Sequence, residues 1–399
     1  TDLTMSISDP IVIVSCARTP MGGMQGDFAP VTASELGGVA IKAALERGGV
    51  SADDIDEVIM GNVLPAGQGQ APARQAAWNA GIPRAAGATT INKMCGSGMK
   101  AVMFAHDTLA AGSADVMVVG GMESMTNAPF LLPKMRSGHK YGHDMVYDHM
   151  ALDGLEDAYD KGRSMGTFAE ATAEKYGFTR EAQDDYAITS LTRAQNAAKS
   201  GHFRDEITPV TYATRKGDVT IDADEQPPKA KPEKIPTLRP AFAKDGTVTA
   251  AHSASISDGA AALVMMRASE AEKRGLKPLA KIVGQATHSQ EPCWFTTAPV
   301  DSIKKVLSRA GWTKDDVDLW EINEAFAVVA MAAIHDLELD HGKVNVHGGA
   351  CALGHPIGAT GARLLVTLIH ALKTHGGTKG VASLCIGGGE ATAVAIELL

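Results

Sequence analysis

The sequence has few aromatic residues, few cysteines and no long hydrophobic run. Aromatic residues make up 5% of its 399 positions, and there are only five cysteines, at 16, 95, 293, 351 and 385. An odd number of widely spaced cysteines argues against a disulfide framework and favours a reducing compartment. The apolar stretch from 325 to 334 is too short to cross a bilayer. We therefore expect a cytoplasmic protein with no membrane partner.

The chain also has no excess of positive charge. The 37 Lys and Arg against 46 Asp and Glu give a net charge of −9, which argues against nucleic acid and anionic membranes as partners. The apolar run from 11 to 17 has no basic segment before it, so it predicts a strand rather than a secretory signal. The terminal Glu-Leu-Leu is not a peroxisomal address. With 45% apolar and 21% charged residues, the chain suits a globular enzyme of two or three domains.

One cysteine stands in a context that favours reactivity. Cys95 lies in Asn-Lys-Met-Cys-Gly-Ser-Gly, directly before apolar residues spaced as on a helix face from 99 to 109. The free N–H groups and positive dipole end of a helix N-terminus favour thiolate over thiol. Gly96 and Gly98 leave the approach open and allow a sharp turn into the helix. The pattern indicates a nucleophile, although a lone cysteine also fits a small core residue.

A histidine occupies a similar position near the C-terminus. His355 lies between Gly354 and Pro356, ahead of a second apolar helix expected over 364–372 and ended by glycines at 376 and 377. The proline and the flanking glycines hold the imidazole outside regular structure. That placement suits an acid or base, and the alternative is a histidine in a turn.

Two further motifs belong to the same region. An apolar strand runs into Cys385, and three glycines beginning at Gly387 lead into a returning strand over 391–398. Consecutive glycines at a strand end let backbone N–H groups point into a cavity, as an oxyanion site requires. Asn323 and Glu324 stand where a strand gives way to a helix. Taken singly, these residues also fit a core cysteine, a hairpin and a helix cap.

The chain repeats itself once. Residues 41–56 recur at 303–318 with a constant offset of 262, including the paired aspartates at 53–54 and 315–316. Gly98 before the first helix matches Gly361 before the second at nearly the same offset. Each half should be a β/α unit with helices on both faces of its sheet, and a pseudo-twofold should relate the halves. Cys95 and His355 then occupy related helix starts and can converge on one cleft.

The region from 125 to 249 differs in composition from the two repeats and separates them. It is rich in charge and histidine, and an amphipathic helix is expected near 180–200. We interpret it as a lid and ligand-binding insertion with an oligomer contact; a solvated loop is the alternative. His139, His143 and His149 match no common ligand spacing, so no metal site is predicted.

Together, Cys-x-Ser, Asn-Glu-Ala-Phe, Gly-His-Pro and Cys-x-Gly, in that order, resemble the signature of the thiolase family. The resemblance runs from the first strand, at 11–20, to the last. It implies an α/β fold of duplicated βαβαβαββ halves in a five-layered α-β-α-β-α core, with an inserted loop domain. The expected bounds are 1–124 plus about 250–272 for the first half, 125–249 for the insertion and 273–399 for the second half.

The resemblance also implies the chemistry. Cys95 would be acylated by a thioester, with His355 drawing its proton, and Cys385 would be the base in condensation and the acid in reverse. A water held by Asn323 would help His355 to stabilise an enolate, while the N–H groups of Cys95 and Gly387 hold the acyl oxygen. The expected activity is reversible condensation of two acetyl-CoA into acetoacetyl-CoA and CoA. Coenzyme A thioesters are the substrates, and no permanently bound cofactor is expected.

The same similarity suggests six contacts for coenzyme A: Arg215 on the adenine side, with Leu155, Met165, Ser255, Ala325 and Phe326 along the channel. The chain departs from the short-chain pattern at four positions. Ser164 stands where His is common, His252 and Ala254 stand where Asn and Ser are usual, and His347 replaces an Asn. These departures lie outside the functional residues of the four motifs, and we expect them to affect substrate affinity.

Alternatives remain open on chain length and on activity. Trp294 and Phe295 stand where short-chain members are often smaller, and bulky groups at the end of an acyl pocket exclude longer chains. The runner-up is a broader 3-ketoacyl-CoA thiolase of fatty-acid β-oxidation. A non-catalytic acyl-CoA or lipid carrier is a third possibility, but it would be expected to lose Cys95 or His355. Residues 134–142 resemble a tetramerisation loop and predict a homotetramer.

Overall fold

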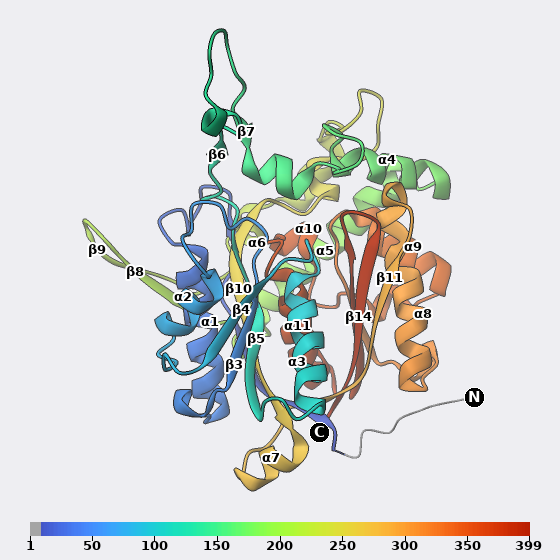
Figure 1. Ribbon diagram of the computed structural model, residues 1–399. Coiled ribbons are helices and arrows are strands. Elements are labelled where there is room, and N and C mark those ends of the chain that lie inside the picture. The colour runs from blue at the N-terminus through green and yellow to red at the C-terminus, as the bar shows by residue number, and fades with distance from the viewer. Residues whose placement is uncertain (1–8) are drawn as a thin grey trace.

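The computed structural model describes residues 9–399, so residues 1–8 of the predicted first half lie outside it. Two similar halves stand side by side, and the inserted region covers one end of both (Figure 1). Within the described residues, no helix is long and apolar enough to cross a membrane.

The first half has the predicted order of elements. These are β1 (Ile11–Arg18), β2 (Gly22–Gly23), α1 (Ala33–Gly48), β3 (Glu57–Gly61), α2 (Pro72–Asn79), β4 (Gly87–Ile91), α3 (Ser97–Ala110), β5 (Val116–Ser124) and, after the insertion, β10 (Ser257–Arg267). Local sequence explains the ends of α1: Thr32 and Glu35 form a capping box, and Gly49 adopts the left-handed conformation that ends the helix.

The second half follows α7 (Ala268–Lys273) and repeats this order with one difference. It contains β11 (Ala280–Ser289), α8 (Ala298–Ala310), β12 (Leu319–Ile322), α9 (Ala327–Leu337), α10 (Ala350–Leu353), α11 (Thr360–His375), β13 (Lys379–Ile386) and β14 (Glu390–Leu398). The strand expected between α9 and α11 is reduced to one bridge, from Trp320 to Val344. Asn345 follows with φ 49°, and this left-handed conformation ends the extended backbone.

The halves share their strands as well as their helices. The sheet order is β12-β13-β14-β11-β1-β10-β5-β3-β4, and β1 joins β11 through Val12 with Lys281 and Ile13 with Ala280. Helices α1 and α2 cover the outer face of the first half, and α8 packs on the outer face of the second. Helices α3 and α11 lie between the two parts of the sheet, which gives five layers (Figure 1).

The central helices pack closely where they begin. A Cβ atom at Gly361 would lie 2.4 Å from the Met99 nitrogen, and one at Gly98 would lie 2.8 Å from the Ala362 nitrogen. Only glycine at both positions allows this approach. The sequence pattern predicted one apolar face for the second helix, but every residue from Thr360 to Leu372 is buried, because α11 has protein on all sides.

The insertion is a folded part of the molecule. It holds β6 (Phe130–Leu131), β7 (Tyr147–Asp148), α4 (Met165–Tyr176), α5 (Arg180–Ser200), β8 (Val210–Thr214), β9 (Gly217–Ile221) and α6 (Gln226–Lys229). The buried Arg18 of β1 pairs with Glu206 at 2.5 Å and with Asp224 at 2.7 Å. These contacts tie the insertion to the core, so the alternative of a solvated loop is wrong. The loop between β6 and β7 and the β8–β9 hairpin project from the body (Figure 1).

Candidate active site

Three of the five predicted catalytic residues meet at one cavity. It has a volume of about 80 Å³, and Cys95, His355 and Gly387 line it together. Cys95 comes from the loop before α3, His355 from the loop before α11, and Gly387 from the turn between β13 and β14. The duplication therefore places one helix start from each half at the same cavity.

Cys95 lies in a tight turn and is partly buried. Met94 before it has φ 47°, an uncommon conformation outside glycine. The two amides that follow do not donate hydrogen bonds to the Cys95 sulfur, because Gly96 N donates to Lys93 O and Ser97 N donates to Met94 O. Burial raises the pKa of the Cys95 thiol to about 11, although the N–H groups of Gly387 and of Cys95 itself oppose the rise.

This corrects the expectation that the helix start favours the thiolate. The dipole effect is small beside the cost of burying a charged sulfur, and the first amides are already used in the turn. Cys95 is therefore neutral at rest and needs a base before it can act as a nucleophile.

His355 is arranged as that base. Its Nδ1 lies 2.6 Å from Thr360 Oγ1, and the Thr360 hydroxyl donates to Pro356 O at 3.0 Å. Because the hydroxyl proton is used, Thr360 accepts from Nδ1–H, which leaves the Nε2 lone pair free. Nε2 is buried and has no hydrogen-bond partner in the described chain. Burial, with a contribution from Arg363, lowers the pKa of His355 to about 3, so the resting ring is neutral.

Cys385 and Asn323 lie behind the cavity wall rather than in it. Both are fully buried. Burial raises the pKa of the Cys385 thiol well above its usual value, and the nearby Cys95 adds to the rise. Asn323 N donates to Ser383 O at 3.0 Å, two residues before Cys385, while both side-chain amide atoms lack a partner in the described chain. An unpaired buried amide is costly and is a place where a small polar molecule can bind.

Sequence reasoning missed the side chains that hold this arrangement together. Glu123 is fully buried and accepts N–H groups from Val63 at 2.9 Å and Gly358 at 2.8 Å. It thus links a loop of the first half to the loop of His355. Burial raises its pKa to about 7 despite these hydrogen bonds. The only signal in the sequence is a lone acid at the end of an apolar strand.

A second link joins the nucleophile loop to the glycine turn. Lys93 Nζ lies 2.5 Å from Glu390 Oε2, and both side chains are partly buried. Lys93 is two residues before Cys95, and Glu390 is the first residue of β14. No spacing rule connects two residues almost 300 positions apart, so sequence reasoning alone could not pair them.

Five of the six predicted coenzyme A contacts line the cavity: Leu155, Met165, Ser255, Ala325 and Phe326. Arg215 does not. It lies at the exposed turn between β8 and β9, a hairpin that projects from the body (Figure 1). Of the two aromatics considered for chain length, Phe295 lines the cavity. Trp294 lies outside it, with Lys175 Nζ 4.2 Å from the centre of its ring.

The four departures fall in different places. Ser164 caps α4 by accepting from Gly166 N, and Ala254 lines the cavity. His252 is fully buried and lies 2.7 Å from Asp184. His347 is buried next to His375, with 3.2 Å between their Nε2 atoms. The departures thus lie at a helix start, at the cavity wall and in two buried polar groups.

Comparisons with known proteins find relatives over nearly the whole chain. The acetyl-CoA acetyltransferase of Cupriavidus necator is 51% identical over 97% of this chain and 99% of its own length. The mitochondrial acetyl-CoA acetyltransferase of Rattus norvegicus is 48% identical over 98% of this chain and 91% of its own length. The crystal structure of the Bacillus anthracis acetyl-CoA acetyltransferase superposes with a TM-score of 0.95 at 41% identity, covering 98% of this chain and 99% of that one.

The family comparison divides the chain near the end of the first half. Residues 11–269 match the N-terminal domain of thiolase, and residues 276–398 match its C-terminal domain. Both matches include the motifs that meet at the cavity, with Cys95 in the first and His355, Cys385 and Asn323 in the second. The chain belongs to the thiolase family.

Proposed function

We propose that the chain is an acetyl-CoA C-acetyltransferase that condenses two acetyl-CoA into acetoacetyl-CoA and CoA, reversibly. The observation that carries the proposal is the meeting of the Cys95 thiol, the free Nε2 of His355 and the Gly387 backbone at one cavity. The names of the relatives support the choice of substrate.

In the first half-reaction, His355 Nε2 takes the proton of Cys95 as the sulfur attacks the acetyl carbonyl. The N–H groups of Cys95 and Gly387 hold the oxyanion of the tetrahedral intermediate. Its collapse breaks the bond to the CoA sulfur, which takes the proton of Cys385. The high pKa of Cys385 keeps that proton in place until a leaving thiolate needs it. The products are acetyl-Cys95 and CoA, with His355 protonated and Cys385 a thiolate.

In the second half-reaction, the Cys385 thiolate takes a proton from the methyl group of a second acetyl-CoA. The Nε2–H of His355 and a water held by the unpaired Asn323 amide stabilise the enolate oxygen. The enolate carbon attacks acetyl-Cys95, and collapse forms acetoacetyl-CoA and frees the Cys95 sulfur. That sulfur recovers its proton from His355, so both protons return and the resting enzyme is restored. Coenzyme A thioesters are the only other reactants in this scheme.

A coupled assay tests the activity directly. The purified chain should consume acetoacetyl-CoA and CoA and yield two acetyl-CoA for each turnover, and in reverse it should form acetoacetyl-CoA from acetyl-CoA. Binding of the thioester without turnover would instead support the non-catalytic carrier.

Chain length separates the proposal from a broader 3-ketoacyl-CoA thiolase. The cavity is small, and the buried Phe295 forms part of its wall. Overpacking typically costs about 1–3 kcal/mol, so acetoacetyl-CoA should be cleaved about tenfold more efficiently than six-carbon homologues. Similar kcat/KM values for four-, eight- and twelve-carbon substrates would favour the broader enzyme. A Phe295→Ala variant should narrow the difference.

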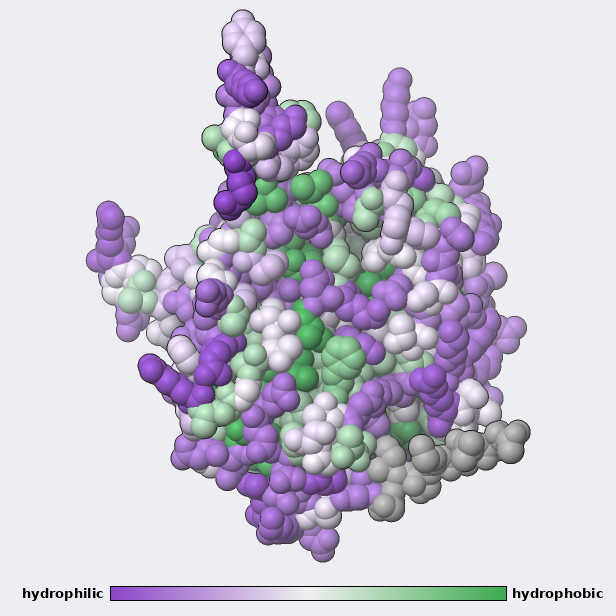
Figure 2. Space-filling model, viewed as in Figure 1, coloured by the Kyte–Doolittle hydropathy of each residue, from purple (hydrophilic) through white to green (hydrophobic). Residues whose placement is uncertain are grey.

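We also propose a cytoplasmic homotetramer assembled through the loop of residues 134–142. This loop stands clear of the body, mainly purple and white with green at its base (Figure 2). The region around it exposes large apolar side chains, which is a cost unless a partner covers them; these are Phe130, Leu132, Met135, Tyr141, Met145 and Val146. Light scattering of the intact chain should give a tetramer and deletion of 134–142 a dimer; a monomeric or dimeric intact chain would contradict the proposal.

A further inference from the structure

One wall of the cavity is a short extended segment, residues 253–257, which we call the thioester wall. Ala254 and Ser255 of this wall line the cavity. Ala254 N donates to Ala325 O at 3.0 Å, and Ser253 forms a bridge with Phe326. The wall therefore sets the position of the loop that carries two of the predicted coenzyme A contacts.

The same wall holds the catalytic histidine. His355 N donates to Ser255 O at 3.2 Å and lies 3.2 Å from Ser257 Oγ. A shift of the wall changes the width of the cavity and the position of His355 together.

His252 fixes the chain one residue before this wall. Thr249 N donates to His252 Nδ1 at 3.1 Å, which closes a capping box around residues 250–252. His252 Nε2 lies 2.7 Å from Asp184 Oδ1 on α5. The histidine side chain is fully buried, so both contacts are made without competition from solvent.

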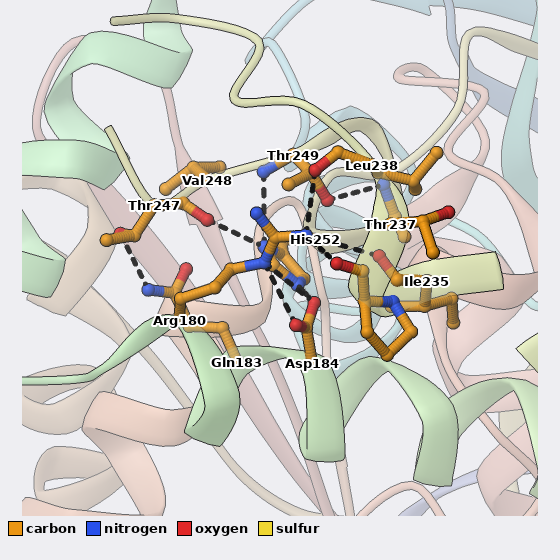
Figure 3. A network of polar contacts seen from close by, with 12 residues as sticks. Arg180, Gln183, Asp184, Ile235, Thr237, Leu238, Thr247, Val248, Thr249 and His252 are labelled. Atoms are coloured by element: carbon orange, nitrogen blue, oxygen red, sulfur yellow. Dashed lines mark hydrogen bonds and ion pairs between the residues drawn. The ribbon is translucent and has the colours of Figure 1, made fainter. Parts of the chain in front are cut away.

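Asp184 is itself held in place. Arg180, one turn earlier on α5, contacts both Asp184 oxygens at 2.9 and 3.0 Å. Arg180 also donates to the carbonyls of Ile235 and Leu238. Figure 3 shows His252 surrounded by these groups, with Asp184 below it, Thr249 above it and Thr247 to its left. The anchor of the wall is thus rigid on its α5 side.

The Nδ1 atom of His252 lies near two groups, of which one donates and the other accepts a hydrogen bond. Thr249 N–H needs an acceptor there, whereas Thr247 O, at 3.2 Å, needs a donor. Neutral His252 with its proton on Nε2 serves Thr249 and Asp184. Protonated His252 has N–H on both nitrogens, so it must release Thr249 and turn to Thr247.

We propose that His252 is a positioning residue for the thioester wall, and that its protonation releases the wall and weakens thioester binding. This rests on the proposed function. The family resemblance places Asn at this position, and an Asn amide can accept from Thr249 N–H but cannot gain a proton near neutral pH. The substitution in this chain therefore adds a proton-sensitive anchor to the substrate pocket.

The direction of the pH effect follows from the surroundings of His252. Burial lowers its pKa from 6.5, Asp184 opposes the shift, and Arg180 adds to it; these are the charged groups that face the ring. Since the folded protein favours the neutral ring, the anchor is complete at pH 6.5 and above, and it is lost only as the pH falls from there through the lowered pKa of His252. KM for acetoacetyl-CoA should rise on the acid side, with a smaller change in kcat.

The test compares His252→Asn with the unaltered chain between pH 8 and 5.5. His252→Asn keeps the contact to Thr249, so its KM at pH 8 should stay within about threefold of the unaltered value. Loss of the acceptor for the buried Thr249 N–H supports a rise in KM of about tenfold at the acid end of this range in the unaltered chain, and His252→Asn should lack that rise. Other titrating groups are common to both proteins, so the difference between the profiles reports on His252.

Asp184→Asn and Asp185→Asn form a matched pair. Asp184→Asn removes the charged partner and should raise KM at every pH, whereas Asp185 is exposed on the same helix and its variant should match the unaltered chain. Hydrogen exchange supplies a readout without substrate: protection of residues 250–257 should fall at pH 5.5 in the unaltered chain and not in His252→Asn.

The two proposals fail in different ways. If the unaltered chain cleaves no acetoacetyl-CoA at any pH, the proposed function is wrong. If it is active but its KM profile and exchange protection are the same in His252→Asn, the role of His252 is wrong. A purely structural role would lower thermal stability in the variant and leave the pH dependence of KM unchanged, which also overturns the proposal.

Discussion

The two halves of the molecule have nearly the same order of elements but hold their functional groups differently. Cys95 is held by a backbone turn, in which its neighbouring amides donate to Lys93 O and Met94 O. His355 is held by side chains, namely Thr360 on Nδ1 and Ser257 at its backbone N. The duplication explains why the groups meet, and burial explains why both are neutral at rest.

The helices behind these groups also differ. Helix α11 is buried from Thr360 to Leu372, whereas α3 exposes Phe104 by 42%. Helix α11 therefore lies wholly inside the molecule, whereas α3 has one free face. Changes at the start of α11 should affect stability and chemistry together, and changes on the outer face of α3 should not.

Replacement of the nucleophile should have the largest effect on activity. Cys95→Ser should fold but lose about 10⁴-fold or more in kcat, because a hydroxyl stays protonated and His355 is too weak a base to change that. Steady-state kinetics with circular dichroism measures both outcomes. Cys293→Ser is the control and should keep its activity. Turnover by Cys95→Ser near the unaltered rate would place the nucleophile elsewhere.

Removal of the base should have the next largest effect. His355→Ala removes the proton acceptor for Cys95 and one donor to the enolate oxygen, so acylation and condensation should each slow by about 10²- to 10³-fold. Single-turnover measurements with acetyl-CoA separate the two steps, and His335→Ala on the exposed side of α9 is the control. Slowing of condensation alone would contradict the double role.

The sequence predicts these residues because their motifs are local. Cys95, His355 and Cys385 each stand beside glycines at the end of a regular element, and the offset of 262 places the first two in related positions. The expectation of a thiolate at Cys95 was wrong, because burial depends on what packs over a site and not on the residues next to it. The full strand expected between α9 and α11 is likewise reduced to one bridge at Val344.

The crossing of α3 and α11 tests through stability how closely the two halves must pack. Gly361→Ala places a Cβ atom 2.4 Å from the Met99 nitrogen, so the free energy of unfolding should fall by about 1–3 kcal/mol. Gly87→Ala in β4 is the control, since its nearest neighbour would lie at 3.5 Å. Chemical denaturation measures both. Equal stability of the two variants would show that the helices do not need this close approach.

The last effect depends on pH and concerns a histidine group that joins the second half to the insertion. Burial lowers the pKa of His347 to about 3, and His202 and His375 add to the shift. The unfolded chain gains this proton below pH 6.5 while the folded chain does not, so stability falls with pH between 6.5 and about 3. His347→Asn should reduce the slope by up to one proton, about 1.4 kcal/mol per pH unit. Denaturation at several pH values measures it, and an unchanged slope would mean that His347 does not cause the acid loss of stability.

Long-range contacts set the limit of what the sequence predicts. Glu123, which links Val63 to Gly358, and the Lys93–Glu390 pair join positions far apart in the chain, and no periodicity indicates them. Arg215 stays a prediction: it lies at an exposed hairpin turn and does not line the cavity, so its expected contact on the adenine side is untested. The three domain ranges stay a prediction.

The central claim is that Cys95 of the first half carries the acyl group while the second half moves the protons. Brief incubation with isotopically labelled acetyl-CoA, followed by digestion and mass spectrometry, tests it most directly. We predict one labelled peptide containing Cys95, discharged on addition of CoA and absent in Cys95→Ser. Label on Cys385 with Cys95 unmodified would contradict the claim.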